Sequence, residues 1–145
     1  IAIGQNAGKD DLIRSGNQHS ALDRKTVLVV EDISSNYLLI SAMLSKHYNL
    51  LHAVHGERAV AMVKEYKIDL LLMDMKMPVM DGLTAAEIRK FDTNIPIVAL
   101  TAHAFESDKV AALKSGCNDY LVKPVDKARL MSVLRKYCHP STLVL

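Results

Sequence analysis

Five short apolar segments alternate with segments of helical periodicity, and this alternation constrains the fold more than any other feature of the chain. The apolar segments are residues 26–30, 50–54, 68–73, 95–100 and 119–123. The first, third and fourth are almost unbroken, which is typical of strands covered on both faces of a parallel sheet. The alternation predicts right-handed crossovers and a doubly wound α/β fold.

The segments between the strands carry residues at helical spacing that can pack on a sheet. These sets are Ile40, Met43, Leu44 and His47; Ala59, Met62, Val63 and Tyr66; Thr84, Ile88 and Phe91; and Leu130, Val133, Leu134 and Tyr137. A further helix is expected over 108–115, capped by Ser107 or Asp108 and ended by Gly116. Asp126 is expected to cap the last helix.

Composition divides the chain into three parts. Residues 1–24 are rich in Gly, Asn, Gln, Asp and Ser, and we interpret them as a linker or a vector-derived remnant. Residues 25–138 form the predicted domain, and residues 139–145 a tail. Because the chain begins with Ile1, we expect it to be a fragment of a longer protein.

Charge and cysteine content narrow the function classes. A formal net charge of +2 does not provide the basic surface that nucleic-acid binding needs. Cys117 and Cys138 are too few for a disulfide framework or a four-cysteine zinc site, and reduced thiols fit a cytoplasmic location. No apolar run approaches the roughly 20 residues that span a bilayer.

Charged and hydroxyl side chains stand at the ends of four predicted strands. They are Glu31, Asp32, Asp74, Thr101 and Lys123. In a doubly wound sheet the carboxyl ends of the strands share one edge, where ligands bind. We therefore expect these side chains to converge, although a solvated acidic edge would account for any one carboxylate alone.

The three carboxylates would repel one another unless a cation lay among them. Their oxygens suit Mg²⁺ or Mn²⁺. The loop after Asp74, residues 75–82, carries Met-Pro and Asp-Gly turn signals and must pass the metal closely. The backbone carbonyl of Lys76 is therefore a candidate ligand, whereas the Lys76 side chain is expected to point elsewhere and control access.

An aspartate between a divalent cation and a lysine can attack phosphorus, since both cations neutralise phosphoryl oxygens in the transition state. Asp74 and Lys123 supply this pair, and the Thr101 hydroxyl can donate to the same group. Pro124 ends the last strand, and a cis Lys123–Pro124 bond would direct Lys123 into the pocket. The sequence does not decide whether that bond is cis.

Four segments together resemble the receiver domain of two-component response regulators. They are VLVVED (27–32), MDMKMPVMDG (73–82), ALTA (99–102) and YLVKP (120–124), and the resemblance covers about residues 25–137. It implies a flavodoxin-like, five-stranded parallel sheet of strand order 2-1-3-4-5 with five helices. It also implies that Asp74 accepts a phosphoryl group from a phosphohistidine or a small phosphodonor.

The resemblance assigns roles to the remaining site residues. Mg²⁺ would be held by Glu31 through water, by Asp32 and Asp74, and by the Lys76 carbonyl, while Lys123 and Thr101 would contact the phosphoryl oxygens. Tyr120 would be the switch aromatic that moves inward with Thr101, changing the surface formed by residues 108–115, strand 119–123 and the last helix. The switch is a shift between two packings.

Within the family, the segment EDISSNYLLI (31–40), which includes Asn36, most resembles the C-terminal receiver of a hybrid sensor histidine kinase. The parent chain would then be a histidine kinase, and any membrane attachment would come through it. The partners implied are a phosphohistidine domain, a histidine phosphotransfer protein, or a second copy. A receiver of a separate response regulator and a degenerate, non-phosphorylated interaction module remain alternatives.

Two other folds of similar chemistry were weighed. A haloacid-dehalogenase phosphatase also uses an Asp nucleophile with Mg²⁺, but it needs a second Asp where this chain has Lys76. A flavodoxin-like FMN binder needs a phosphate cradle, which Ser34 and Ser35 could imitate, yet Glu31 and Asp32 would repel the phosphate. The resemblance to a receiver domain is compatible with Lys76 at this position and with the acidic pair Glu31 and Asp32.

Lys76 and His103 flank the path of a hydrolytic water. We hypothesise that Lys76 shields the phosphoryl group and slows hydrolysis. His103 is interpreted as an exposed loop residue rather than a phosphodonor. The remaining histidines show no metal-ligand spacing.

Overall fold

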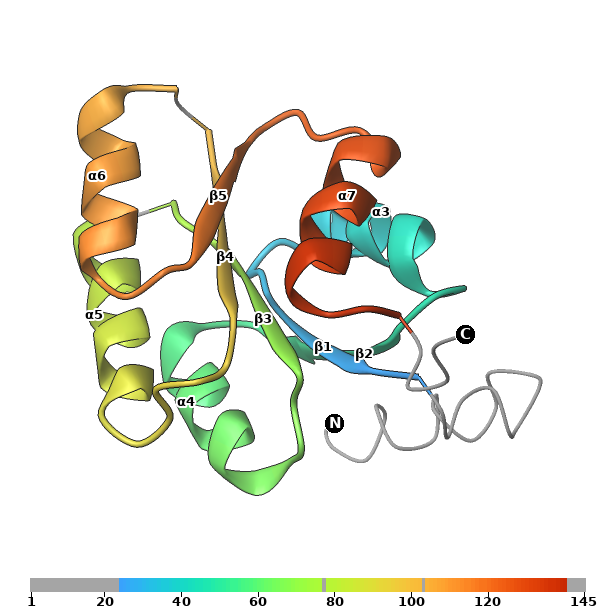
Figure 1. Ribbon diagram of the computed structural model, residues 1–145, viewed down its shortest axis with the longest axis horizontal. Coiled ribbons are helices and arrows are strands. Elements are labelled where there is room, and N and C mark those ends of the chain that lie inside the picture. Colours follow the sequence, from blue (N-terminus) through green and yellow to red (C-terminus); the bar gives the residue numbers. More distant parts are fainter. Residues whose placement is uncertain (1–23, 77, 103, 141–145) are drawn as a thin grey trace.

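The computed structural model describes residues 24–140 except 77 and 103. A central parallel sheet separates two layers of helices, with α3 and α7 on one face and α4, α5 and α6 on the other (Figure 1). In chain order the elements are β1 (Thr26–Val30), α3 (Ser34–Leu44), β2 (Asn49–Ala53), α4 (Gly56–Glu65), β3 (Leu70–Asp74), α5 (Pro78–Arg89), β4 (Ile97–Thr101), α6 (Glu106–Lys114), β5 (Asp119–Val122) and α7 (Lys127–Tyr137).

The strand order is β2-β1-β3-β4-β5, and every neighbouring pair is parallel. This confirms the predicted doubly wound sheet. The order reverses at β1, which is followed along the chain by β2 on one side and then by β3 on the other. The carboxyl ends of β1 and β3 therefore lie side by side at the switch point, where doubly wound folds place their ligand sites.

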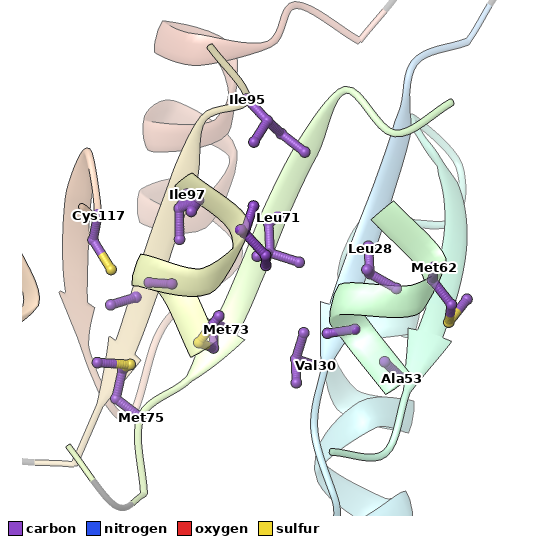
Figure 2. Packing of buried hydrophobic residues seen from close by; sticks show 14 of the residues in the cluster. Leu28, Val30, Ala53, Met62, Leu71, Met73, Met75, Ile95, Ile97 and Cys117 are labelled. Carbon is purple, nitrogen blue, oxygen red and sulfur yellow. The ribbon is translucent and has the colours of Figure 1, made fainter. Parts of the chain in front are cut away.

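Alternate residues of each central strand enter different cores. In β1, Val27 and Val29 pack with residues of α3 and α7, whereas Leu28 and Val30 pack with residues of α4, α5 and α6. Figure 2 shows Leu28 and Val30 in the second of these clusters. Because both faces are buried, each central strand needs an apolar residue at almost every position, as its sequence predicted.

Two strands begin later than their apolar runs suggested. β3 begins at Leu70 rather than 68, and β4 at Ile97 rather than 95. Before β4, the Asp92 carboxylate accepts hydrogen bonds from the backbone N–H groups of Asn94 and Ile95, both at 2.9 Å. This side-chain turn competes with strand pairing, so the apolar character of Ile95 serves packing and not the ladder.

The helix ends test the capping predictions. Asp126 caps α7, since its carboxylate accepts the backbone N–H of Arg129 at 2.7 Å. The prediction of Ser107 or Asp108 as the cap of a helix over 108–115 was wrong, because α6 begins at Glu106 after Phe105, whose extended backbone makes no side-chain cap bond. Gly116 follows α6 with φ +114°, as a glycine stop requires.

The loop after β3 is shorter than predicted. Helix α5 begins at Pro78, so the Asp81-Gly82 pair lies within a helix and does not form a turn. Proline is favoured in the first helical turn because its missing N–H is not needed there. This start leaves only residues 75–77 between β3 and the helix.

Both cysteines are free and buried, and burial raises the pKa of each thiol to about 11. Neither thiol is therefore ionised near neutral pH. Within the described range, no helix combines the length and apolarity needed to cross a bilayer. Residues 1–23 and 141–145 lie outside the described residues, as does the predicted site-flanking residue His103.

Candidate functional site

The carboxyl ends of β1, β3 and β5 bring three predicted site residues into contact. Lys123 Nζ donates to Asp74 Oδ2 at 2.7 Å and lies 3.9 Å from Glu31 Oε1. Backbone bonds continue the sheet just past these strand ends, from Glu31 N to the Ala53 carbonyl at 2.9 Å and from Lys123 N to the Thr101 carbonyl at 2.8 Å. The sheet itself thus fixes where the side chains leave the backbone.

Glu31 is the most deeply buried charged residue of the site. Its side chain has no exposed surface, and Oε2 accepts the backbone N–H of Ile33 at 3.0 Å. Its other oxygen, Oε1, has no hydrogen-bond partner among the described residues. A buried acceptor without a donor is costly, so this oxygen favours a cation nearby.

Asp74 and Glu31 titrate as a coupled pair. Burial and the neighbouring Glu31 raise the pKa of Asp74 to about 6, although Lys123 opposes the change. Burial also acts to raise the pKa of Glu31, but hydrogen bonding to Asp74, to the Ile33 N–H and to Lys76 lowers it to about 2. Two adjacent carboxyl groups share one proton more readily than both ionise, and of the two, Asp74 takes up a proton at the higher pH.

The Lys76 side chain does not point away from the site, and that prediction was wrong. Its Nζ lies 2.7 Å from Asp32 Oδ1, 3.1 Å from Glu31 Oε2 and 3.8 Å from Asp74 Oδ2. The three carboxylates repel one another, and a cation among them relieves that repulsion. The Lys76 ammonium, two residues after Asp74, provides such a cation. Asp32, with a side chain 61% exposed, joins the cluster through this lysine.

Thr101 and Tyr120 border one small cavity behind the site. Thr101 is buried at the end of β4, and Tyr120 is partly buried in β5. A cavity of about 10 Å³ is lined by both residues together with Met75, Ala99, Asp108, Lys109 and Ala112. Lys109 Nζ lies 5.1 Å from the centre of the Tyr120 ring, and a cation at this range attracts the ring face.

The Lys123–Pro124 peptide bond is cis, and the Lys123 side chain reaches Asp74 as expected from a site-directed lysine. Ser34 and Ser35 open helix α3, separated from the acidic pair by Ile33.

His52, in the second strand, was not among the residues predicted to belong to the site. The Nε2 atom of His52 lies 2.7 Å from the backbone carbonyl of Glu31, and the ring stacks on Tyr37 with 3.9 Å between centres. These contacts fix the backbone of Glu31 from the β2 side. Only the strand register brings them together, so no local sequence signal pointed to them.

The donor set of the site fits a hard divalent cation. Glu31, Asp32 and Asp74 offer carboxylate oxygens, the ligand type that Mg²⁺ prefers. The buried Glu31 Oε1 accepts no hydrogen bond from the described residues. Across residues 24–140, with the two gaps noted, no three acidic, His or Cys side chains are already gathered as a ligand set. Lys76 Nζ stands among the carboxylates instead, so the residues fit the ion once that ammonium withdraws.

Comparison with known proteins identifies the family. The sequence matches the response regulator receiver domain over residues 27–135, which is more than half of the 145-residue chain. The chain belongs to the response regulator receiver domains, the phosphoacceptor domains of two-component signalling.

Relatives of this chain are much longer proteins. The histidine-protein kinase BarA of Escherichia coli (strain K12) is 38% identical over 118 residues, which are 77% of this chain and 13% of BarA. Sensor protein GacS of Pseudomonas syringae pv. syringae is 42% identical over 118 residues, which are 77% of this chain and 13% of GacS. Transcriptional regulatory protein ZraR of Salmonella typhimurium is 41% identical over 112 residues, or 76% of this chain and 25% of ZraR. The chain thus spans a quarter or less of each.

Solved structures agree with the fold. The receiver domain of sensor histidine kinase PA1611 from Pseudomonas aeruginosa has a TM-score of 0.71 at 36% identity, covering 79% of this chain and 97% of that one, and holds magnesium in its active site cleft. A co-crystal of the Saccharomyces cerevisiae phosphotransfer protein Ypd1 with the receiver of Ssk1 gives 0.73 at 35% identity, covering 80% and 90%. Receiver domains therefore bind Mg²⁺ and interact with histidine phosphotransfer proteins.

Asp74→Asn is expected to stabilise the metal-free protein near neutral pH. The folded pKa of Asp74, about 6, exceeds its ordinary value of 3.8, so the folded wild type binds more protons than the unfolded chain between these values. Wild-type stability relative to the variant therefore falls as the pH rises through this window. The difference should be small at about pH 4 and reach about 2–3 kcal/mol above about pH 7.

Urea unfolding in the presence of a chelator measures this difference. Glu65→Gln, which neutralises a half-exposed carboxylate paired with Arg58, is the control and should change stability little at either pH. A difference between Asp74→Asn and wild type that does not vary with pH would contradict the assignment of the raised pKa.

Proposed function

We propose that Asp74 is the phosphoacceptor of this receiver domain. The observation that carries the proposal is the contact between the buried Asp74 carboxylate and Lys123 Nζ at 2.7 Å. In the transfer, an Asp74 oxygen forms a bond to phosphorus while the bond from phosphorus to the donor's imidazole nitrogen breaks. The imidazole retains that electron pair and takes up a proton. Lys123 compensates the charge of the phosphoryl oxygens.

Mg²⁺, or Mn²⁺ in its place, would be held by Glu31, Asp32, Asp74 and the Lys76 carbonyl and would supply further charge neutralisation for the phosphoryl group. This chain contributes the rest of the chemistry. Lys123 approaches Asp74 from β5, and Thr101 at the end of β4 supplies a hydroxyl for the phosphoryl group. Binding of a cation beside Asp74 favours its ionised form, which the attack on phosphorus requires.

We further propose that a histidine phosphotransfer domain docks on α3 and the loop before α7. Leu38 and Leu39 of α3 are 64% and 63% exposed. A groove of about 470 Å³ lies between α3 and the β5–α7 loop, and its lining includes Leu39, Lys123 and Pro124. A donor seated there would reach the site from the Lys123 side, with exposed apolar residues to bury.

For the parent protein we propose a cytoplasmic C-terminal receiver of a hybrid sensor histidine kinase. The similarity to BarA and GacS supports this origin, while the similarity to ZraR supports a receiver of a separate response regulator as the alternative. Tyr120 and Thr101 would carry the switch, since they border one cavity behind the site. The same changed surface on α6, β5 and α7 would serve a homodimer.

Incubation with acetyl phosphate and Mg²⁺ tests the proposed acceptor. Intact mass should rise by about 80 Da, one phosphoryl group replacing a proton, and the gain should require both the metal and Asp74. Asp74→Asn is the control, and Asp92→Asn, in a turn remote from the site, should be labelled like wild type. Labelling that persists in Asp74→Asn would overturn the assignment.

If acetyl phosphate does not label the protein, a phosphorylated histidine kinase core is tested next as the phosphodonor. Failure with a phosphorylated histidine kinase core as well would identify a degenerate interaction module. Continuous release of phosphate from a generic phosphate ester would instead indicate a phosphatase, since a receiver reacts once and stops.

Leu39→Asp should slow phosphotransfer from a phosphorylated histidine phosphotransfer protein by on the order of tenfold or more, because a charge in the apolar groove opposes docking. Labelling by acetyl phosphate should persist, since a small donor needs no docking surface. Leu83→Asp, on α5 and equally exposed at 66%, is the matched control and should transfer normally. Equal transfer by the two variants would place the docking surface elsewhere.

Lys76→Ala should shorten the lifetime of the phosphorylated protein several-fold, because the long Lys76 side chain, released from the carboxylates when the metal binds, would cover the approach of water to the phosphoryl group. Loss of the phosphoryl mass over time, followed at saturating Mg²⁺, measures this rate. Lys90 is an exposed lysine that pairs with Glu87. The control variant Lys90→Ala should therefore behave like wild type. An unchanged lifetime in Lys76→Ala would refute the shielding hypothesis.

A further inference from the structure

Lys76 contacts the same three carboxylates that a divalent cation would need. Its Nζ lies within 4 Å of Asp32, Glu31 and Asp74 at once. We infer that the Lys76 ammonium is a built-in counterion that competes with the divalent cation, so that the metal binds only when the lysine leaves. This inference rests on the metal site of the proposed function and concerns what regulates its occupancy.

The two lysines of the site stand in different places around Glu31. Lys123 approaches Oε1 at 3.9 Å and bonds Asp74, whereas Lys76 approaches Oε2 at 3.1 Å and bonds Asp32. Lys123 therefore leaves the Asp32 side of the cluster open. Lys76 fills it, bridging the exposed Asp32 and the buried Glu31, which is where a cation would need to bind both.

Charge counting shows why the lysine and the metal exclude each other. Counted as ionised, the three carboxylates and two ammoniums carry one net negative charge. Adding a divalent cation without moving Lys76 would leave one net positive charge in a largely buried space, with two cations in contact. Withdrawal of Lys76 brings the cluster to neutrality. Like charges at this separation repel strongly when water is excluded.

The Lys76 side chain can leave at small cost. It is 33% exposed, and a lysine has a flexible four-carbon stem that carries its charge into water. The backbone of Lys76 need not move, so its carbonyl stays available to the metal while the ammonium departs. In the absence of metal, the ammonium compensates the negative charge of the carboxylates and so reduces the repulsion among them.

The consequence is a lowered affinity for Mg²⁺ in the wild-type protein. Removing the lysine charge should tighten Mg²⁺ binding, because the metal no longer displaces an ion pair. The same change should destabilise the metal-free protein, since three carboxylates then share only Lys123. These opposite effects distinguish competition from a merely structural role, which would weaken both binding and folding.

Titration calorimetry with MgCl₂ on the full chain tests the inference. Lys76→Met should bind Mg²⁺ on the order of tenfold more tightly than wild type. Lys76→Arg, which retains the charge, should remain within about threefold of wild type. Lys90→Met removes an equal charge from a side chain that is 72% exposed just after α5 and should also stay near the wild-type value.

A measurement on the wild type covers the case in which Lys76→Met does not fold. In NMR spectra of protein labelled with ¹⁵N at lysine Nζ, the Lys76 ammonium signal should be observable without metal. As Mg²⁺ is added, its chemical shift should move toward that of a solvent-exposed lysine. The signal is assigned with Lys76→Arg. A signal that keeps its position through saturation would overturn the inference, because the ammonium would then coexist with the metal.

The outcomes separate this inference from the proposed function. Equal Mg²⁺ affinity in wild type and Lys76→Met, or equal tightening in Lys90→Met, would overturn the competition while leaving the metal site standing. Absence of Mg²⁺ binding in wild type, Lys76→Met and Lys76→Arg alike would overturn the metal site and with it both proposals. Phosphorylation of Asp74 by acetyl phosphate, measured beside these titrations, shows independently whether the acceptor works.

Discussion

Parallel pairing of β1 with both β2 and β3 is the constraint on which this structure depends. It buries both faces of the central strands, and it sends their carboxyl ends to one edge. Glu31 and Asp74 are therefore held together by the backbone ladder, against their mutual repulsion. The cores on the two faces supply the stability that an electrostatically unfavourable cluster requires.

The site balances that repulsion in two ways that use different parts of the chain. At the strand ends themselves, the Lys123 ammonium contacts Asp74, and the raised pKa of Asp74 eases its protonation. Lys76 adds a second ammonium from the short loop before α5, and its contact with Asp32 extends the cluster toward solvent. The receiver domain of a relative from Pseudomonas aeruginosa holds magnesium in its active site cleft. In the chain described here, the proposed competition would make binding of the metal and release of the Lys76 ammonium one event.

Much of the fold and most of the site could be predicted from sequence because their signals are local. Unbroken apolar runs predicted the central strands, and the position of Glu31, Asp74, Thr101 and Lys123 at strand ends predicted a shared edge. The errors arose where two local signals competed. Proline is favoured both in turns and in the first turn of a helix, so Pro78 is compatible with either structure. The local sequence does not show how close this segment lies to the sheet, and so it could not decide between them. Ser107 and Asp108 can cap a helix, yet α6 begins two residues before the predicted start at 108, at Glu106.

The sequence by itself determined the fold class, the strand order implied by its family resemblance, and the chemical identity of the candidate acceptor and its lysine. The fold class follows from periodicity, the candidate acceptor and its lysine from the residue types at strand ends, and the strand order only from the family resemblance. Only the tertiary structure decided that Lys76 turns into the acidic cluster, that His52 contacts the Glu31 backbone, and that burial and Glu31 raise the pKa of Asp74. Each depends on distances between side chains from different strands, which burial and charge set only once the sheet has formed.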